Sequence, residues 1–244
     1  MSDAATGGLV GYLAASPLPG LTLTLCAFLV AQWAHVRTGR APWANPVAIA
    51  VFLVTGILAL GGIPYDVYFD SAQFIHFLLG PATVALAVPL ARLWPRLKLA
   101  WRPLTAGLLA GSVMAIVSGT TMVLLMGGDK VLAMSMVPKS ATSPIAMSVA
   151  EHLGGLPSLA VSFTLVAGMV GAIVGVSVLR LLRLDTSVLG GFALGVASHG
   201  IGTARAFQVS MDMGAFAGLG MGLNGIVTAV LAPWMAPVIM WLFG

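Results

Sequence analysis

Residues that could bind a small anion are concentrated in one short segment of an otherwise apolar chain. Pro138 and Pro144 enclose the sequence Lys-Ser-Ala-Thr-Ser, and because proline lacks a backbone N–H, they free backbone groups beside one cation and three hydroxyls. A helix that restarts near Pro144 would point its N-terminal amides at this segment. An exposed loop is the alternative, but the sequence on both sides is apolar. The substrate-binding residues predicted here are Lys139, Ser140, Thr142 and Ser143.

A second polar cluster interrupts the apolar run 186–211. Residues 198–205 read Ser-His-Gly-Ile-Gly-Thr-Ala-Arg, so a titratable group and a fixed cation lie beside two glycines that let the backbone unwind. Many transporters build substrate sites from such broken helices near the middle of the membrane. The alternative is a continuous helix with a glycine packing face, whose arginine reaches the interface. The substrate-binding residues predicted in this cluster are His199, Gly200, Thr203 and Arg205.

A third interruption, Gly-Pro-Ala-Thr at 80–83, partly repeats the first. Pro-Ala-Thr ending at Thr83 is similar to Ser-Ala-Thr ending at Thr142, which suggests an internal repeat of two interrupted segments. The match is short enough to arise by chance in apolar sequence. On this pattern we also expect Thr83 to contribute to the substrate site.

Single polar groups at membrane depth complete the candidate set. Asn224 lies in the last apolar run and is predicted to bind substrate, with a helix–helix hydrogen bond as the alternative. A proton-coupled mechanism needs a side chain that titrates near neutral pH or a carboxylate that can relay a proton. The candidates for this role are His199, Glu151 and His76.

Other kinds of chemistry lack the residues they require. The four histidines do not have metal-site spacing, the one cysteine has no partner, and no Gly-Lys-Ser/Thr phosphate loop is present. Ser198 and His199 lack the glycine pattern of a nucleophile elbow. We therefore expect a protein without metal or cofactor that is not an enzyme.

The elements that must position these residues are membrane helices. Of 244 residues, 59% are hydrophobic and 7% are charged, far fewer charges than a soluble domain carries. About 20 apolar residues cross the hydrocarbon core as a helix. A run at 71–91 contains only His76, and the run 186–211 is interrupted as described. The runs without any charge or histidine are 4–34, 41–65, 103–128, 153–179 and 213–244.

The sequence therefore predicts an all-α integral membrane protein with one polytopic domain over residues 1–244. Lys and Arg favour cytoplasmic loops, which places the loops at 37–40, 92–102 and 180–183 inside. This rule gives seven spans plus a re-entrant hairpin at 131–153, with the N-terminus outside and the C-terminus cytoplasmic. Eight full spans remain the alternative. The net charge of +4 is explained by these loops, and no nucleic-acid partner is expected.

Four strings of residues together resemble the LrgB/CidB family of membrane proteins. They are Gly-Pro-Ala-Thr-Val-Ala-Leu-Ala from residue 80, Pro-Lys-Ser-Ala-Thr-Ser-Pro-Ile-Ala from 138, Ala-Ser-His-Gly-Ile-Gly-Thr-Ala-Arg-Ala from 197, and Gly-Met-Gly-Leu-Asn-Gly from 220. The resemblance covers about 60–244. It implies either a holin/antiholin-like regulator of murein hydrolase export and lysis, paired with a small LrgA/CidA-type membrane protein, or a relative of plastidal glycolate/glycerate translocators. Some bacterial members are linked to pyruvate uptake.

The polar residues favour transport between these two functions. One lysine, one arginine and several hydroxyls suit a carboxylate, whereas a lytic pore would need none of them. We expect a secondary transporter of a small monocarboxylate, coupled to protons, in the bacterial plasma membrane. A homo-oligomer is also expected. A lysis regulator that acts through a small membrane partner is the alternative.

Overall fold

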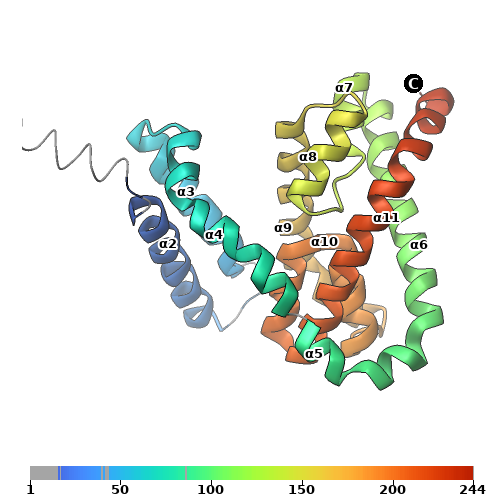
Figure 1. Cartoon of the computed structure of the whole chain (residues 1–244), viewed down its shortest axis with the longest axis horizontal. Helices are drawn as coiled ribbons and strands as arrows, with labels where there is room; N and C mark the ends of the chain where they lie inside the picture. The colour runs from blue at the N-terminus through green and yellow to red at the C-terminus, as the bar shows by residue number, and fades with distance from the viewer. Residues whose placement is uncertain (1–15, 17, 40, 42–43, 86, 244) are drawn as a thin grey trace, which may run out of the picture. The chain divides into compact units, whose positions relative to one another are not determined.

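The computed structural model describes residues 16, 18–39, 41, 44–85 and 87–243, and all the secondary structure in these ranges is helical (Figure 1). The chain divides into two compact units, 1–85 and 86–244. Four of the described helices are long and apolar enough to cross a membrane. The all-α membrane class is therefore confirmed, whereas the full count of spans and the single domain stay predictions.

The described residues of the first unit form three helices. They are α2 (Leu18–Arg37), α3 (Pro46–Gly61) and α4 (Tyr65–Ala85). The Asn45 side chain caps α3 by accepting hydrogen bonds from two backbone amides, and Gly62 ends it in the left-handed conformation, with φ 61°. A bond of 2.7 Å between the Thr24 and Tyr68 hydroxyls joins α2 to α4.

The interruption predicted at 80–83 is absent from this unit. Helix α4 continues through Pro81 to Ala85. One proline near the end of a membrane helix removes a single hydrogen bond, which does not force a break. The side chains of His76 and Thr83 lie outside the described part of the structure, so their predicted roles are not tested.

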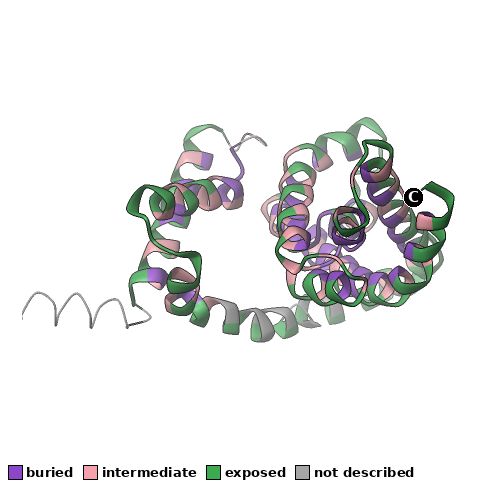
Figure 2. Ribbon diagram, turned by 90° about the horizontal axis from the view of Figure 1, so that it is seen from above, coloured by how far each residue is buried: buried purple, intermediate pink, exposed green. Residues whose placement is uncertain are grey.

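The second unit is built from three long helices and shorter segments between them. The long helices are α6 (Trp94–Leu125), α9 (Pro157–Leu181) and α11 (Met211–Phe243). Helix α5 (Ala87–Arg92) precedes α6. The remaining segments are α7 (Lys130–Met136), α8 (Ser143–His152) and α10 (Ser187–Val209). Buried residues concentrate where these helices meet (Figure 2).

Helices α7 and α8 form a hairpin that enters the unit and returns. Seven and ten residues give helices of about 10 and 15 Å, far short of the roughly 30 Å hydrocarbon core. The chain after α8 comes back to α7, where Leu156 N donates to Ser135 Oγ at 2.8 Å. The segment 131–153 therefore has the shape of the re-entrant prediction and not that of an eighth span.

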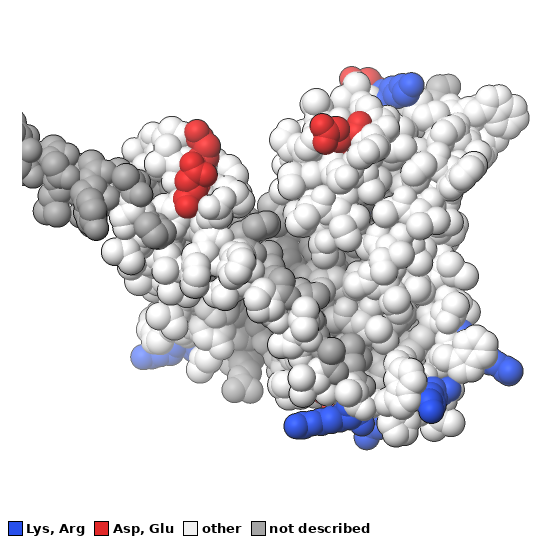
Figure 3. Space-filling model, viewed as in Figure 1, with Lys and Arg blue, Asp and Glu red and all other residues white. Residues whose placement is uncertain are grey.

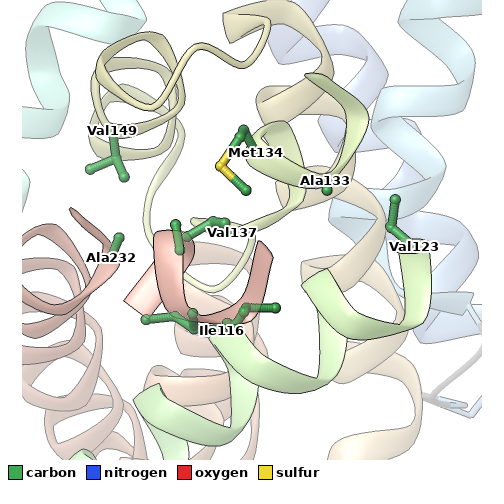
Figure 4. Packing of buried hydrophobic residues seen from close by; sticks show 9 residues of the cluster. Ile116, Val123, Ala133, Met134, Val137, Val149 and Ala232 are labelled. Carbon is green, nitrogen blue, oxygen red and sulfur yellow. The ribbon is translucent and has the colours of Figure 1, made fainter. Parts of the chain in front are cut away.

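Apolar packing holds this hairpin in place. Val137 and Ala133 are fully buried in one cluster with Ile116 and Val123 of α6 and Ala232 of α11 (Figure 4). Lipid chains are as apolar as these side chains, so the gain comes from close packing rather than from escape from water. The hairpin is thus an integral part of the unit's core.

The run 186–211 was predicted to be a span, and this prediction is wrong. The backbone of α10 leaves the helical conformation at His199, with φ 39° and ψ −132°. A Cβ on Gly202 would lie 2.6 Å from Leu194 O, eight residues earlier, and this proximity requires the second arm to fold back on the first. A straight helix of 23 residues would instead be about 34 Å long.

The contacts of α11 confirm this reversal. A Cβ on Gly191, near the start of α10, would lie 3.0 Å from the carbonyl carbon of Met213, near the start of α11. The end of α10 also leads directly into α11. Both ends of α10 therefore lie at the same end of the unit, and α10 is a second hairpin.

The reversal changes the side on which the chain ends. Arg96 in α6 and Asp212 in α11 form an ion pair of 2.6 Å, so both helices begin at the end of the unit that we call the basic end. Figure 3 shows basic side chains gathered there. Helix α11 then runs to the opposite end, where Ile239 packs in the same cluster as Val123. Helix α11 therefore ends opposite the basic loops, whereas the sequence predicted a C-terminus on their side; which side is cytoplasmic stays a prediction. The basic end is defined by Arg92, Arg96, Lys98, Arg102, Arg180 and Arg183.

We predict that the two ends of α10 face the same side of the membrane. In a Cys26→Ala background, Asp185→Cys and Val209→Cys should both react with an impermeant maleimide from one side of oriented vesicles. Met126→Cys, at the opposite end, is the control and should react from the other side. Labelling of residues 185 and 209 from opposite sides would instead show that α10 spans the membrane.

Candidate functional site

Each hairpin carries a basic side chain at its bend. Lys139 Nζ donates to Ala115 O of α6 at 2.7 Å, and His199 Nε2 lies 2.8 Å from Thr164 O of α9. A carbonyl oxygen only accepts, so Nε2 of His199 carries the hydrogen and Nδ1 is the basic nitrogen. Each bend is therefore tied to the backbone of the long helix that precedes it.

One helical turn after each of these carbonyl groups, the long helix has a glycine that the basic side chain packs against. A Cβ on Gly119 would lie 2.6 Å from Lys139 Cε, and a Cβ on Gly168 would lie 2.5 Å from His199 Cε1. Helix α6 leaves the basic end, whereas α9 approaches it. The two helix–hairpin pairs are thus related as inverted halves, which is a common plan of transporters. The repeat predicted from residues 80–83 and 140–142 is a different one.

The two bends meet on one turn of α11. Asn224 Nδ2 donates to Ser140 O at 2.8 Å, and Thr203 Oγ1, one turn after His199, lies 3.9 Å from Met221 Sδ. Residues 221 and 224 are adjacent on the helix surface. The structure therefore brings together the polar clusters around Lys139 and His199.

Asn224 has no polar atom left for a substrate. Its Oδ1 accepts from Ser112 Oγ at 2.7 Å, and its Nδ2 donates to the bend at Ser140. Both serines and Asn224 are buried. This is the helix–helix bond given as the alternative, so Asn224 positions the bend.

A cavity of about 440 Å³ leads from the neighbourhood of the basic end to the α7–α8 bend. One face of α6 and one face of α10 form its walls, together with Ala167 of α9. The wall residues of α6 and α10 are Pro103, Leu104, Gly107, Gly111, Met114, Ala115, Ser118, Leu189, Phe192, Ala193, Val196 and Ala197. These walls are apolar except at Ser118 and at the bend, where Lys139 and Ser140 line the cavity. Pockets for small ligands commonly have this size and this balance of apolar wall and few polar groups.

Lys139 is the charged group of this cavity. It is half-buried, and within the described residues no carboxylate lies at ion-pair distance from it. One of its three N–H groups is used by Ala115 O. The remaining donors can bind an anion that enters the cavity.

The rest of the first predicted cluster surrounds the start of α8. This helix begins at Ser143, as expected from Pro144, and Thr142 occupies the N-cap without a side-chain bond to the helix. Both residues are half-buried. They adjoin the bend without lining the cavity.

Ser198, His199 and Thr203 are buried and do not line the cavity. Thr203 Oγ1 donates to His199 O at 2.9 Å, while Gly200 is exposed. The hydroxyls of Ser198 and Thr164 are buried and have no hydrogen-bond partner among the described residues. These two unsatisfied hydroxyls belong to the residue before His199 and to the residue whose carbonyl oxygen the imidazole contacts.

Two predicted residues lie away from the bends. Arg205, on the returning arm of α10, donates to Gln208 Oε1 at 2.9 Å and does not line the cavity. Glu151 is exposed at the end of α8. No three His, Cys, Asp or Glu side chains in the described part of the chain are close enough to hold a metal ion.

Sequence reasoning missed the partners of the two bends. Ser112 is a hydroxyl in an uncharged run, and its polarity could have indicated a contact. Ala115 and Thr164 act through backbone carbonyls, for which a side chain gives no signal.

Comparison with known proteins identifies the same family as the four sequence strings. The LrgB-like family matches residues 24–238, so the match begins earlier in the chain than the resemblance seen in the sequence. Uncharacterized protein YxaC of Bacillus subtilis (strain 168) is 35% identical over 91% of this chain and 95% of its own length. Holin-like protein CidB of Staphylococcus aureus (strain N315) is 31% identical, over 79% of this chain and 84% of its own. Holin-like protein CidB of Staphylococcus epidermidis is also 31% identical, over 87% and 93% respectively. No solved structure matches the chain.

We predict that Asn224→Leu lowers stability because it leaves the buried Ser112 hydroxyl and Ser140 carbonyl without their partner. Loss of such bonds costs about 1–3 kcal/mol. Thermal unfolding of the purified protein in detergent should show a lower Tm. Thr228→Val is the matched control, since the Thr228 contact with Asn224 is long at 3.5 Å, and it should change Tm much less. Equal Tm values for the two variants would contradict the positioning role.

Proposed function

The chain belongs to the LrgB-like family, and we propose that it transports a small organic anion across the plasma membrane. The observation that carries the proposal is Lys139. This cation stands at the inner end of an apolar cavity, beside the Ser140 hydroxyl and without a carboxylate partner in the described residues. Charged groups at membrane depth are costly, and they usually serve an ion or substrate.

The substrate class follows from the size and polarity of this cavity. A carboxylate can accept hydrogen bonds from Lys139 Nζ and Ser140 Oγ, and a short carbon chain can contact the apolar walls. Glycolate, glycerate and pyruvate have this form. Binding and release of such an anion require no covalent chemistry, cofactor or metal.

Alternating access is supported by the inverted halves. In transporters of this plan, one hairpin or bundle moves relative to the rest and opens the site to one side at a time. The basic end is cytoplasmic by the distribution of Lys and Arg, and the cavity approaches this end. The same rule puts the start of α2 outside, because Arg37 lies at its other end. The α10 hairpin is then the gate on the cytoplasmic side.

His199 is the preferred residue for proton coupling. Its Nδ1 can take up a proton while Nε2–H keeps the bond to Thr164 O, so the bend can change charge without losing its anchor. Glu151 is exposed at the end of α8 and does not line the cavity.

A holin-like function is the second candidate, and the names of the relatives support it more directly than they support anion transport. The CidB proteins of Staphylococcus aureus and Staphylococcus epidermidis carry the name holin-like. A cavity of about 440 Å³ in a single copy is too small to pass a protein. Lysis control would therefore need an assembly of copies or a small LrgA/CidA-type partner.

We predict that the protein in liposomes takes up labelled glycolate, glycerate or pyruvate, and that Lys139→Gln abolishes most of this uptake. A charge-assisted hydrogen bond is worth about 1.5–3 kcal/mol, so substrate affinity should fall roughly 10- to 100-fold. Lys130→Gln, an exposed lysine at the start of α7, is the control and should retain uptake. Absence of uptake of all three acids by folded protein would refute the transport proposal.

We also predict that these liposomes retain an encapsulated dye much larger than the cavity. A transporter opens to one side at a time, so its path never admits a large molecule. The measurement is dye fluorescence after reconstitution, with empty liposomes and a pore-forming peptide as the two references. Dye release that depends on the amount of protein would favour the holin-like function instead.

A further inference from the structure

The first turns of α6 form a basic and aromatic surface at the basic end. Trp94 and Trp101 are more than half exposed, at 52% and 57%. Lys98 Nζ lies 5.4 Å from the centre of the Trp94 ring, and Arg102 Cζ lies 5.5 Å from that of Trp101. Tryptophan, lysine and arginine are the residues that membrane proteins place at the level of lipid headgroups.

An apolar groove adjoins this surface. Its volume is about 540 Å³, and α6 lines it with Leu97, Trp101 and Leu108, opposite Phe192 of α10 and Leu223 of α11. From Trp101 to Leu108 the helix rises about 10 Å, two thirds of the roughly 15 Å depth of one leaflet. The groove can hold much of a lipid acyl chain.

Two basic side chains lack a carboxylate partner here: Lys98, which lines the groove, and Arg102, which lies over the ring of the groove residue Trp101. Arg96 pairs with Asp212, whereas neither Lys98 nor Arg102 has a carboxylate at ion-pair distance within the described residues. Lys98 is also the charged member of the groove lining. An occupant that combines an apolar chain with a negative headgroup would satisfy both parts.

We propose that this groove binds one anionic phospholipid from the leaflet at the basic end. Its phosphate lies beside Lys98 and Arg102, and one acyl chain follows α6 toward Leu108. The site is separated from the substrate cavity by Leu104 and Phe192, which line both, and it does not depend on what the cavity binds. A second copy of the chain is a poorer occupant. In a parallel dimer it would bring its own basic end against Lys98 and Arg102.

Native mass spectrometry of the full-length protein in detergent tests this site. Phosphatidylglycerol should bind more tightly than phosphatidylcholine of the same chain length. Juxtamembrane Lys and Arg each strengthen binding to anionic lipid about fivefold, so Lys98→Gln with Arg102→Gln should weaken phosphatidylglycerol binding roughly 25-fold. The matched control is Arg180→Gln with Arg183→Gln. These two basic residues of the same end lie on α9 and just after it, where no residue lines the groove, so the change should leave this binding unchanged.

A second variant tests the groove itself. Thr105→Trp fills the groove without changing any charge, and it should reduce phosphatidylglycerol binding while the Tm stays close to that of the parent. Three results would overturn the proposal. They are equal affinity for the two lipids, an equal loss of phosphatidylglycerol binding in the Lys98/Arg102 and Arg180/Arg183 variants, and a dimer that excludes lipid from the groove.

Discussion

The second unit depends on one constraint, which is that backbone polar groups inside a bilayer must find partners within the protein. A hairpin that stops halfway through the membrane ends a helix where no water can satisfy it, and each unsatisfied group costs several kcal/mol. Here the bends are anchored by specific bonds. Lys139 reaches Ala115 O, and His199 reaches Thr164 O. Asn224 holds Ser140 O from a third helix. The polar residues that make a substrate site conceivable are thus also the residues that make the hairpins stable. Selection on either role would retain them.

Sequence reasoning recovered the parts of this arrangement that side chains reveal. The apolar runs predict membrane helices, and Pro138, Lys139 and Pro144 predict an interrupted segment, which the structure forms as the α7–α8 bend. The run at 186–211 was misjudged because its length and hydropathy fit a span. A folded-back helix differs from a straight one in contacts that the sequence does not show, such as Gly202 against Leu194. The glycines beside His199 predict a break in this region, but the backbone turns at the histidine itself and not at a glycine.

The inverted repeat was out of reach for a different reason. It consists of a backbone carbonyl followed one turn later by a glycine, in helices that run in opposite directions. A carbonyl is common to every residue, and this chain has 30 glycines, so neither half of the pattern is distinctive in sequence. Residues 80–83 and 140–142 are similar in sequence, yet helix α4 is continuous through residues 80–83. The segments that are similar in sequence are therefore not the ones that correspond in the structure, which are α6 with the α7–α8 hairpin and α9 with the α10 hairpin.

Helix α11 links the two bends, and this bears on how the unit can move. Asn224 contacts the first bend, and Met221, one turn earlier, contacts Thr203 beside the second. A shift of either hairpin along the membrane normal must disturb the same turn of α11. The Asn224 bonds are direct and short, whereas the Met221 contact is a weak one to sulfur, so the two attachments differ in strength. Thioether side chains repack easily. The weaker attachment lies on the α10 hairpin, which borders the cavity that reaches toward the basic end. The first arm of α10, however, also packs closely against the α11 backbone, with Gly195 against Ala217 and Phe192 against Gly220, so a motion of α10 must carry this part of α11 with it.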